Sequence, residues 1–317
     1  MTLHRPKNRR KKPGVAQKRD ASRASSAQVA HHVLDKDQRV HLILTHAGPH
    51  GKKQLQLTHS IFEREWQNRL ALATARTAFS ALEHECTTRS IMRLGQHAGA
   101  SLGTLIAHQL SQAQPAIACT SGCDHCCHQR VGATPVEAIA IAGYLAATCT
   151  AADLADLRER LGAFVDKTRA LSAQERYSPD HACPLLKDHK CLVYPVRPLA
   201  CRGVHSFDQK ACESELRDPE IRQAFLRGDR PGHAFREPLQ AVHAVSAGLQ
   251  LALSEQFALD MRPLDLAHAL LLLLDCDTSL SAAQQWLDGL PALSQAKTDQ
   301  GPGTQHDPVF KHDLGLV

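Results

Sequence analysis

Cysteines are the residues of this 317-residue chain whose type and spacing most clearly suggest chemistry. There are 11, and nine of them lie between Cys119 and Cys212. A first group has the spacing C-x3-C-x2-C-C in a segment that contains Gly122, and a second group follows about 55 residues later. Cysteine thiolates bind zinc and iron–sulfur clusters, and each of these usually takes four protein ligands. The sequence therefore predicts a metal centre, with the candidate ligands Cys119, Cys123, Cys126, Cys127, Cys183, Cys191, Cys201 and Cys212.

Eight candidate thiols exceed the needs of one four-ligand site, so either two sites exist or some cysteines are spares. Cys126 and Cys127 are neighbours, and neighbouring side chains diverge, which makes a single zinc bound by both strained. An extended cluster or two sites fits them more easily. The other cysteines, Cys86, Cys149 and Cys276, lie within helical patterns and are expected to be buried small apolar side chains.

Histidines and arginines also lie beside these cysteines. A histidine can replace a thiolate at zinc or support a ligand from outside, but the chain has 20 histidines, so none is singled out. Arg197 and Arg202 flank Cys201, and they either offset the charge of a thiolate-rich site or are ordinary surface arginines. The neighbouring histidines are His125, His128, His181, His189 and His205.

Helices must position these groups, because the apolar residues recur with helical spacing. Thr134, Pro135 and Glu137 predict a capped helix start, and this helix would run to about Cys149. With a second helix over about 152–170, it would return the second cysteine group to the first. A helix is expected from Ile61 onward, because Phe62, Trp66, Leu70 and Ala73 recur at spacings of four, four and three and would share one apolar face. Other helices are expected over 88–113, 210–227, 237–258, 263–275 and 281–289.

The predicted fold class is mainly α, a helical scaffold with an irregular Cys-rich metal-binding element. Low aromatic content, 4%, leaves a core of Leu, Ala and Val, which favours helices. No secondary structure is assigned to 26–60. The predicted segments are a disordered basic tail (1–25), an N-terminal helical region (61–115), a cysteine-cluster domain (116–215), a C-terminal helical region (216–292) and a disordered tail (293–317).

Charge is spread unevenly along the chain. Residues 1–23 carry nine Lys and Arg against one acidic residue, whereas the remainder carries 28 basic and 31 acidic residues. The body is therefore not expected to bind nucleic acid. The basic tail is either a solubilising segment or the contact for an anionic partner, which would be RNA, DNA or a membrane surface.

A cytoplasmic location is expected, with no membrane span. The most apolar run, inside 264–276, is shorter than the roughly 20 residues that cross a bilayer. No apolar stretch follows the basic N-terminus, so a secretory signal is not expected. In a reducing compartment the cysteines are free thiols or metal ligands rather than disulfides.

The combined motif resembles the YkgJ-type cysteine-cluster family, also named the CxxCxxCC or zinc- or iron-chelating domain. The similarity rests on Cys119 to Cys127, on Pro135-x-Glu137-Ala138, on Cys183-Pro-Leu-Leu, on Cys191-x2-Tyr194 and on Arg197-Pro198-x2-Cys201-Arg202, and it covers about 119–215. The stretch from Ser206 to Glu213 resembles longer members. One departure is that three residues separate Cys119 from Cys123, where the family pattern has two. The resemblance implies metal chelation by Cys123, Cys126, Cys127, Cys183, Cys191 and Cys201, and it favours an iron–sulfur cluster over zinc.

The leading functional hypothesis is a metal-binding protein, redox-active with an iron–sulfur cluster or structural with zinc. The alternative is an enzyme with unknown catalytic residues. Cys119-x3-Cys123-x2-Cys126 matches the radical S-adenosylmethionine spacing, although His125 replaces the usual aromatic residue. The resemblance also implies a protein-lysine N-methyltransferase-like activity, because a flagellin lysine N-methylase is related to the family. No glycine-rich nucleotide loop supports a Rossmann-type methyl-donor site.

Overall fold

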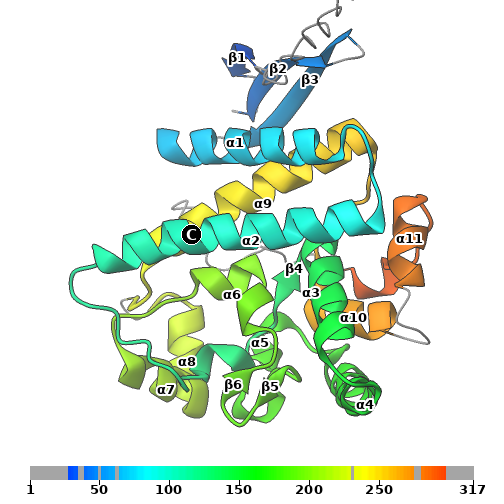
Figure 1. Ribbon diagram of the computed structural model, residues 1–317. Coiled ribbons are helices and arrows are strands. Elements are labelled where there is room, and N and C mark those ends of the chain that lie inside the picture. Colours follow the sequence, from blue (N-terminus) through cyan, green and yellow to red (C-terminus); the bar gives the residue numbers. More distant parts are fainter. Residues whose placement is uncertain are drawn as a thin grey trace, which may run out of the picture.

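The computed structural model describes residues 28–34, 39–48, 51–60, 64–229, 232–274 and 280–297. This part of the chain is mainly α, as predicted. In Figure 1, α1 (Glu65–Leu82), α9 (Arg236–Phe257) and α2 (Thr88–Ser111) form stacked layers. The helices from α3 (Pro135–Thr148) to α8 (Pro219–Leu226) lie beneath α2. The helices are α1 (Glu65–Leu82), α2 (Thr88–Ser111), α3 (Pro135–Thr148), α4 (Ala151–Thr168), α5 (Ala173–Arg176), α6 (Leu199–Gly203), α7 (Gln209–Arg217), α8 (Pro219–Leu226), α9 (Arg236–Phe257), α10 (Leu266–Leu274) and α11 (Ser281–Leu287). The 3₁₀ helices are η1 (His125–His128), η2 (Pro179–His181), η3 (Tyr194–Val196) and η4 (Ser294–Ala296).

Small residues let α1 and α9 pack closely. The buried face of α1 includes Ala71, Ala75 and Ala78, and this face lies against α9. A Cβ added to Gly248 of α9 would lie 2.3 Å from the carbonyl oxygen of Ala71. The backbones of the two helices therefore approach at a distance that only glycine permits at this position.

Gly248→Ala is expected to lower the free energy of unfolding by about 1–3 kcal/mol, because the added methyl group meets rigid backbone. The added Cβ would also lie 2.7 Å from the Cβ of Thr74. Thermal or urea unfolding measures this effect. Gly162→Ala in α4 is the matched control: its Cβ would meet nothing within 4 Å, so helix propensity should stabilise that variant slightly. Equal effects of both substitutions would contradict the close packing of α1 on α9.

Helix α3 lies in the centre of the core. Ten of its 14 residues are buried, as expected for a helix that is apolar on all sides. Its start confirms the predicted cap: Thr134 is the N-cap, Pro135 occupies the first turn, and Glu137 completes the capping box. α2 packs against α3, and α10 packs against both α3 and α4.

Three short sheets accompany the helices, and none of their strands was predicted. β1 (Gln28–Leu34), β2 (Arg39–Gly48) and β3 (Gly51–Ser60) form an antiparallel sheet in that order, and β3 contacts α9. β4 (Gly132–Ala133) pairs with β7 (Leu264–Asp265), and β5 (Leu186–Lys187) pairs with β6 (Lys190–Cys191).

Two helix predictions need correction. The helix predicted over 210–227 is two helices, because Asp218 caps α8 and Pro219, which lacks an amide hydrogen, follows it. The apolar stripe predicted through Trp66, Leu70 and Ala73 is displaced by one position: Ala73 is exposed, and the alanine face described above is buried instead.

The core includes buried side chains from α2, α3 and α9, so it draws on each of the helical regions 61–115, 116–215 and 216–292. The division of the chain into those regions stays a prediction. Tail residues 1–25 and 298–317 lie outside the described residues, whereas Ser294–Ala296 form η4. No described helix combines the length and apolar character that crossing a bilayer requires.

Candidate metal centre

The first cysteine group lies on the connection between α2 and α3. The amide of Cys123 donates to Thr120 O at 3.1 Å, closing a turn in which Gly122 has a φ of 88°. A side chain would strain that conformation, so the glycine allows Cys119 and Cys123 to lie on either side of a tight turn. Cys126 and Cys127 follow in η1, where the amide of Cys127 donates to Asp124 O at 2.7 Å.

The second group returns to the first, as predicted. The amide of Cys183 donates to the carbonyl oxygen of Cys127 at 2.8 Å. Cys191 lies in β6 opposite Leu186 of β5, and the hairpin turn has positive φ angles at Asp188 and His189. His189 at the tip also pairs with the Asp124 carboxylate at 2.8 Å, which ties the hairpin to the first group.

Cys201 lies in α6, and a buried carboxylate positions that helix. Glu137 Oε1 accepts a hydrogen bond from the amide of Leu199, the first residue of α6, at 2.7 Å. Glu137 Oε2 accepts from the amide and hydroxyl of Thr134 at 2.8 and 2.7 Å. Burial raises the pKa of Glu137, and the hydrogen bonds from Thr134 and Leu199 oppose that rise. One side chain thus fixes the starts of both α3 and α6.

Cys119 and Cys212 are connected to the rest of the candidate site through other segments of the chain. The Cys119 sulfur accepts a hydrogen bond from the Ser206 amide at 3.4 Å, and the Ala118 amide donates to Ser206 O at 2.9 Å. Cys212 lies in α7, which contacts η1. Its sulfur lies 3.7 Å from Nδ1 of His233.

Burial and neighbouring thiols raise the pKa of six of these cysteines. Burial is the largest cause that raises the pKa of Cys119, Cys123, Cys183, Cys191 and Cys201, and the pKa of Cys183 reaches about 12. The pKa of Cys126 is raised first by its hydrogen bond with Cys127 and then by burial of the sulfur, although the residue as a whole is exposed.

Electrostatic effects connect all eight candidate ligands. Cys126 raises the pKa of four others, Cys119, Cys123, Cys191 and Cys201. Cys212 acts on Cys119, Cys123 and Cys126, whereas Cys183 is linked to Cys191 and Cys201. The structure therefore brings the eight cysteines into one neighbourhood with Cys126 at its centre. Within the described residues, however, no three Cys, His, Asp or Glu side chains are arranged to hold one metal ion.

The groups around the cysteines fit a thiolate-bound metal. Arg197 lowers the pKa of Cys119, Cys191 and Cys201, and its buried Nε has no hydrogen-bond partner. A positive charge at this position would offset the negative charge of thiolates. Arg202 has a structural role: its guanidinium donates to the carbonyl oxygens of Arg197 at 3.1 Å and Pro195 at 2.7 Å.

The neighbouring histidines divide into three kinds. His128 and His181, in the contacting helices η1 and η2, each have a buried Nδ1 without a hydrogen-bond partner, and so does His205. Burial, and then Arg197, lower the pKa of His205. His189 is paired with Asp124 as described, and His125 lies at the start of η1. Three imidazoles near the cysteines are thus available to a metal or to an outer partner of one.

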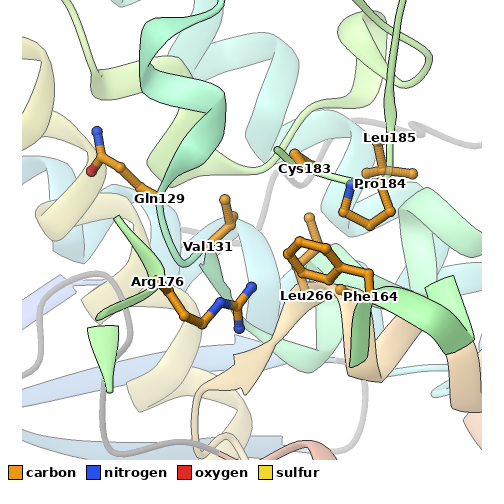
Figure 2. A pocket seen from close by; sticks show the side chains of 9 residues that line it. Gln129, Val131, Phe164, Arg176, Cys183, Pro184, Leu185 and Leu266 are labelled. Atoms are coloured by element: carbon orange, nitrogen blue, oxygen red, sulfur yellow. The ribbon is translucent and has the colours of Figure 1, made fainter. Parts of the chain in front are cut away.

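A small pocket borders Cys183 (Figure 2). On its lining, the guanidinium of Arg176 lies 4.9 Å from the ring centre of Phe164. Arg176 also forms a buried ion pair with Asp265, whose other carboxylate oxygen accepts from the His268 amide at 3.2 Å near the start of α10. These contacts join the second cysteine segment to the core helices.

The remaining cysteines have mixed outcomes. Cys149 is half-buried at the C-cap of α3 and packs against the core, in line with the expectation. Cys86 is exposed in the loop after α1, so the prediction that it is buried is wrong. Cys276 lies outside the described residues.

Comparison with known proteins agrees with the resemblance found in the sequence. Residues 118–218 match the CxxCxxCC family, described as a putative zinc- or iron-chelating domain. The match covers about a third of the chain and contains all eight candidate ligands. Comparisons with curated proteins and with solved structures gave no match. The fold and the comparison therefore define a mainly helical protein with a cysteine-rich domain that is similar to the zinc- or iron-chelating family.

Sequence reasoning missed Glu215 and His233. His233 lies outside the matched domain and 21 residues from Cys212, yet its ring lies between Cys212 and Glu215. Hydrogen bonds with Cys212 and then with Glu215 raise the pKa of His233 to about 10. No local spacing in the sequence marks Glu215 and His233 as a pair, because the packing of loops and helices brings these two residues together.

Proposed function

We propose that this protein is a cytoplasmic metal-binding protein whose cysteine element holds an iron–sulfur cluster. The observation that carries the proposal is the meeting of the two cysteine groups, where the Cys183 amide donates to the carbonyl oxygen of Cys127 at 2.8 Å. The proposed ligands are drawn from Cys119, Cys123, Cys126, Cys127, Cys183, Cys191, Cys201 and Cys212.

The number and grouping of the thiols favour iron–sulfur over a single zinc. Cys212 raises the pKa of Cys119 and Cys123, whereas Cys183 and Cys191 raise the pKa of Cys201. Cys126 raises the pKa of members of both sets. One tetrahedral zinc needs only four ligands and leaves half of the thiols unused. Two sets that share a central cysteine suit an extended cluster or two adjacent centres.

An iron–sulfur cluster supplies one-electron transfer, with a potential set by burial, hydrogen bonds to sulfur and nearby charge. In this chain, Arg197 places positive charge beside three of the proposed ligands. This charge supports electron transfer or redox sensing. The mainly helical fold gives no support to a radical S-adenosylmethionine enzyme, which needs a barrel of alternating strands and helices.

Zinc is the alternative occupant, and it would have a structural role. A zinc ion with four protein ligands stabilises loops that have little core of their own. The segment from 112 to 134 fits that description, because η1 and β4 are its only regular elements. Under this alternative the search for function would move to binding partners.

The metal content of the full-length protein, purified without oxygen, tests the proposal. We expect iron and acid-labile sulfide in equal amounts per chain, because clusters of this kind contain one inorganic sulfide per iron. Zinc without sulfide would overturn the iron–sulfur assignment and support the structural alternative. The absence of both metals, also after anaerobic reconstitution with iron and sulfide or with zinc, would refute metal binding altogether.

A further inference from the structure

The imidazole of His233 links a buried carboxylate to a candidate metal ligand. His233 Nε2 lies 2.7 Å from Oε1 of Glu215, and Nδ1 lies 3.7 Å from the Cys212 sulfur and 2.7 Å from the Ser206 hydroxyl. Glu215 is only 4% exposed. Because a carboxylate accepts hydrogen bonds, Nε2 carries a proton and Glu215 fixes the ring.

The backbone around His233 fixes the ring further. The Phe207 amide donates to His233 O at 2.9 Å, and the Phe235 amide donates to His205 O at 2.9 Å. Between these bonds, Ser206 forms an isolated antiparallel bridge with Ala234. Ser206 is also the residue whose backbone binds Cys119 and Ala118. The segment that carries His233 is therefore attached directly to the strand-like segment beside Cys119.

A hydrolytic Ser-His-Glu triad does not explain this arrangement. Ser206 is 5% exposed, which leaves no access for a substrate. Its hydroxyl oxygen accepts from the Asp208 amide at 2.9 Å and donates to Asp208 O at 3.0 Å. The hydroxyl proton is thus used within the turn, and a lone pair of the oxygen faces Nδ1 of His233. A proton on Nδ1 would therefore face two acceptors, the Ser206 oxygen and the Cys212 sulfur.

We propose that His233 is a positioning residue of the metal centre, which donates Nδ1–H to the sulfur of Cys212 while Glu215 holds Nε2–H. This inference rests on the proposed function, because it takes Cys212 as a ligand. A hydrogen bond to a ligating thiolate orients the sulfur and disperses its charge, and loss of such outer partners typically weakens metal binding. The metal centre then extends beyond the matched domain, which ends at residue 218.

Zinc titration of the reduced, full-length protein against a chromophoric chelator tests the inference. We expect His233→Ala to weaken zinc affinity by about ten- to a hundredfold. His233→Asn places an amide donor near the Nδ1 position and should stay within about threefold of wild type, whereas His233→Gln, whose amide reaches the Nε2 position, should behave like His233→Ala. A purely structural role would not distinguish these two amides. Equal affinities for the Asn and Gln variants would therefore overturn the inference.

A double-mutant cycle with Cys212→Ala shows whether His233 acts through that sulfur. If it does, removal of His233 from the Cys212→Ala protein causes no further loss of zinc affinity. An undiminished second loss would overturn the inference. His84→Ala is the matched control, because His84 pairs with the Glu83 carboxylate at 3.4 Å and belongs to neither cysteine group; it should leave affinity unchanged.

The outcome also separates this inference from the proposed function. If wild type takes up no zinc and no cluster, metal binding itself fails. If wild type binds zinc and His233→Ala binds it equally well, only the role of His233 fails. The melting temperature of each metal-free variant, compared with wild type, shows whether a loss of affinity comes from unfolding.

Discussion

Cys126→Ser is expected to remove most of the bound metal. Cys126 affects the pKa of Cys119, Cys123, Cys191 and Cys201, so its sulfur lies among ligands of both sets. Loss of a ligand costs more than the roughly ten- to hundredfold in affinity that follows loss of an outer hydrogen-bond partner. Because a metal that binds only the folded state stabilises it, the melting temperature of the metal-loaded protein should fall as well.

Metal analysis and thermal unfolding of the same preparations measure these effects. Cys86→Ser is the matched control: Cys86 is a free, exposed thiol in the loop after α1 and is not among the proposed ligands. It should keep the metal content and melting temperature of wild type. Unchanged metal content and melting in Cys126→Ser would exclude Cys126 as a ligand.

Glu137→Ala is expected to give the largest loss of stability, about 3–5 kcal/mol. The substitution leaves three buried donors without an acceptor: the amide and hydroxyl of Thr134 and the amide of Leu199. Glu137→Gln retains one acceptor oxygen and places an NH₂ group against a donor, so we expect a smaller but clear loss. Since Leu199 begins the helix that carries Cys201, both variants should also bind metal more weakly.

An exposed capping box provides the comparison for Glu137. At the start of α4, Asp153 accepts from the amide and hydroxyl of Thr150 at 3.1 and 2.6 Å. Asp153→Ala removes the same type of cap in contact with water, which replaces the lost acceptor, and should change neither metal content nor melting by much. Similar losses from both substitutions would show that the cap, rather than the link from α3 to α6, explains the effect of Glu137.

Local signals made most helices predictable. The start of α3 is encoded by Thr134, Pro135 and Glu137 within four residues, and the structure has the predicted cap. The helix break at Asp218–Pro219 was also encoded locally but was overlooked. The buried face of α1 was not predictable from apolar periodicity, because close packing on α9 selects alanines over the larger Leu70 and Trp66.

The strands of the first sheet were not predicted for a different reason, because their local sequence pattern is weak. Leu55 and Leu57 alternate with polar residues in β3, and Gly48 and Gly51 flank its turn with β2, but several histidines and lysines obscure the pattern. A sheet gains stability from cross-strand pairs that a single sequence does not reveal.

The candidate site shows the same contrast between local and distant signals. Spacing alone singled out the eight cysteines as candidates. The structure brings their two groups together, and their role as metal ligands stays a prediction. Sequence reasoning could not identify Glu137 as the link to the helix of Cys201, because nothing in the sequence marks the contact of Glu137 with Leu199, which lies 62 positions further along the chain. His233 was equally hidden, since it reaches Cys212 across α8.

The packing of α1 on α9 has a consequence for biosynthesis. The two helices are separated in the chain by residues 83–235, which include every cysteine of the proposed centre. During translation, the alanine face of α1 therefore has no partner until α9 leaves the ribosome. All eight thiols emerge before that moment, while the helix that covers α1 and contacts α2 and α6 is still unmade. A nascent chain of this protein thus exposes its complete thiol set before its helical layers can close.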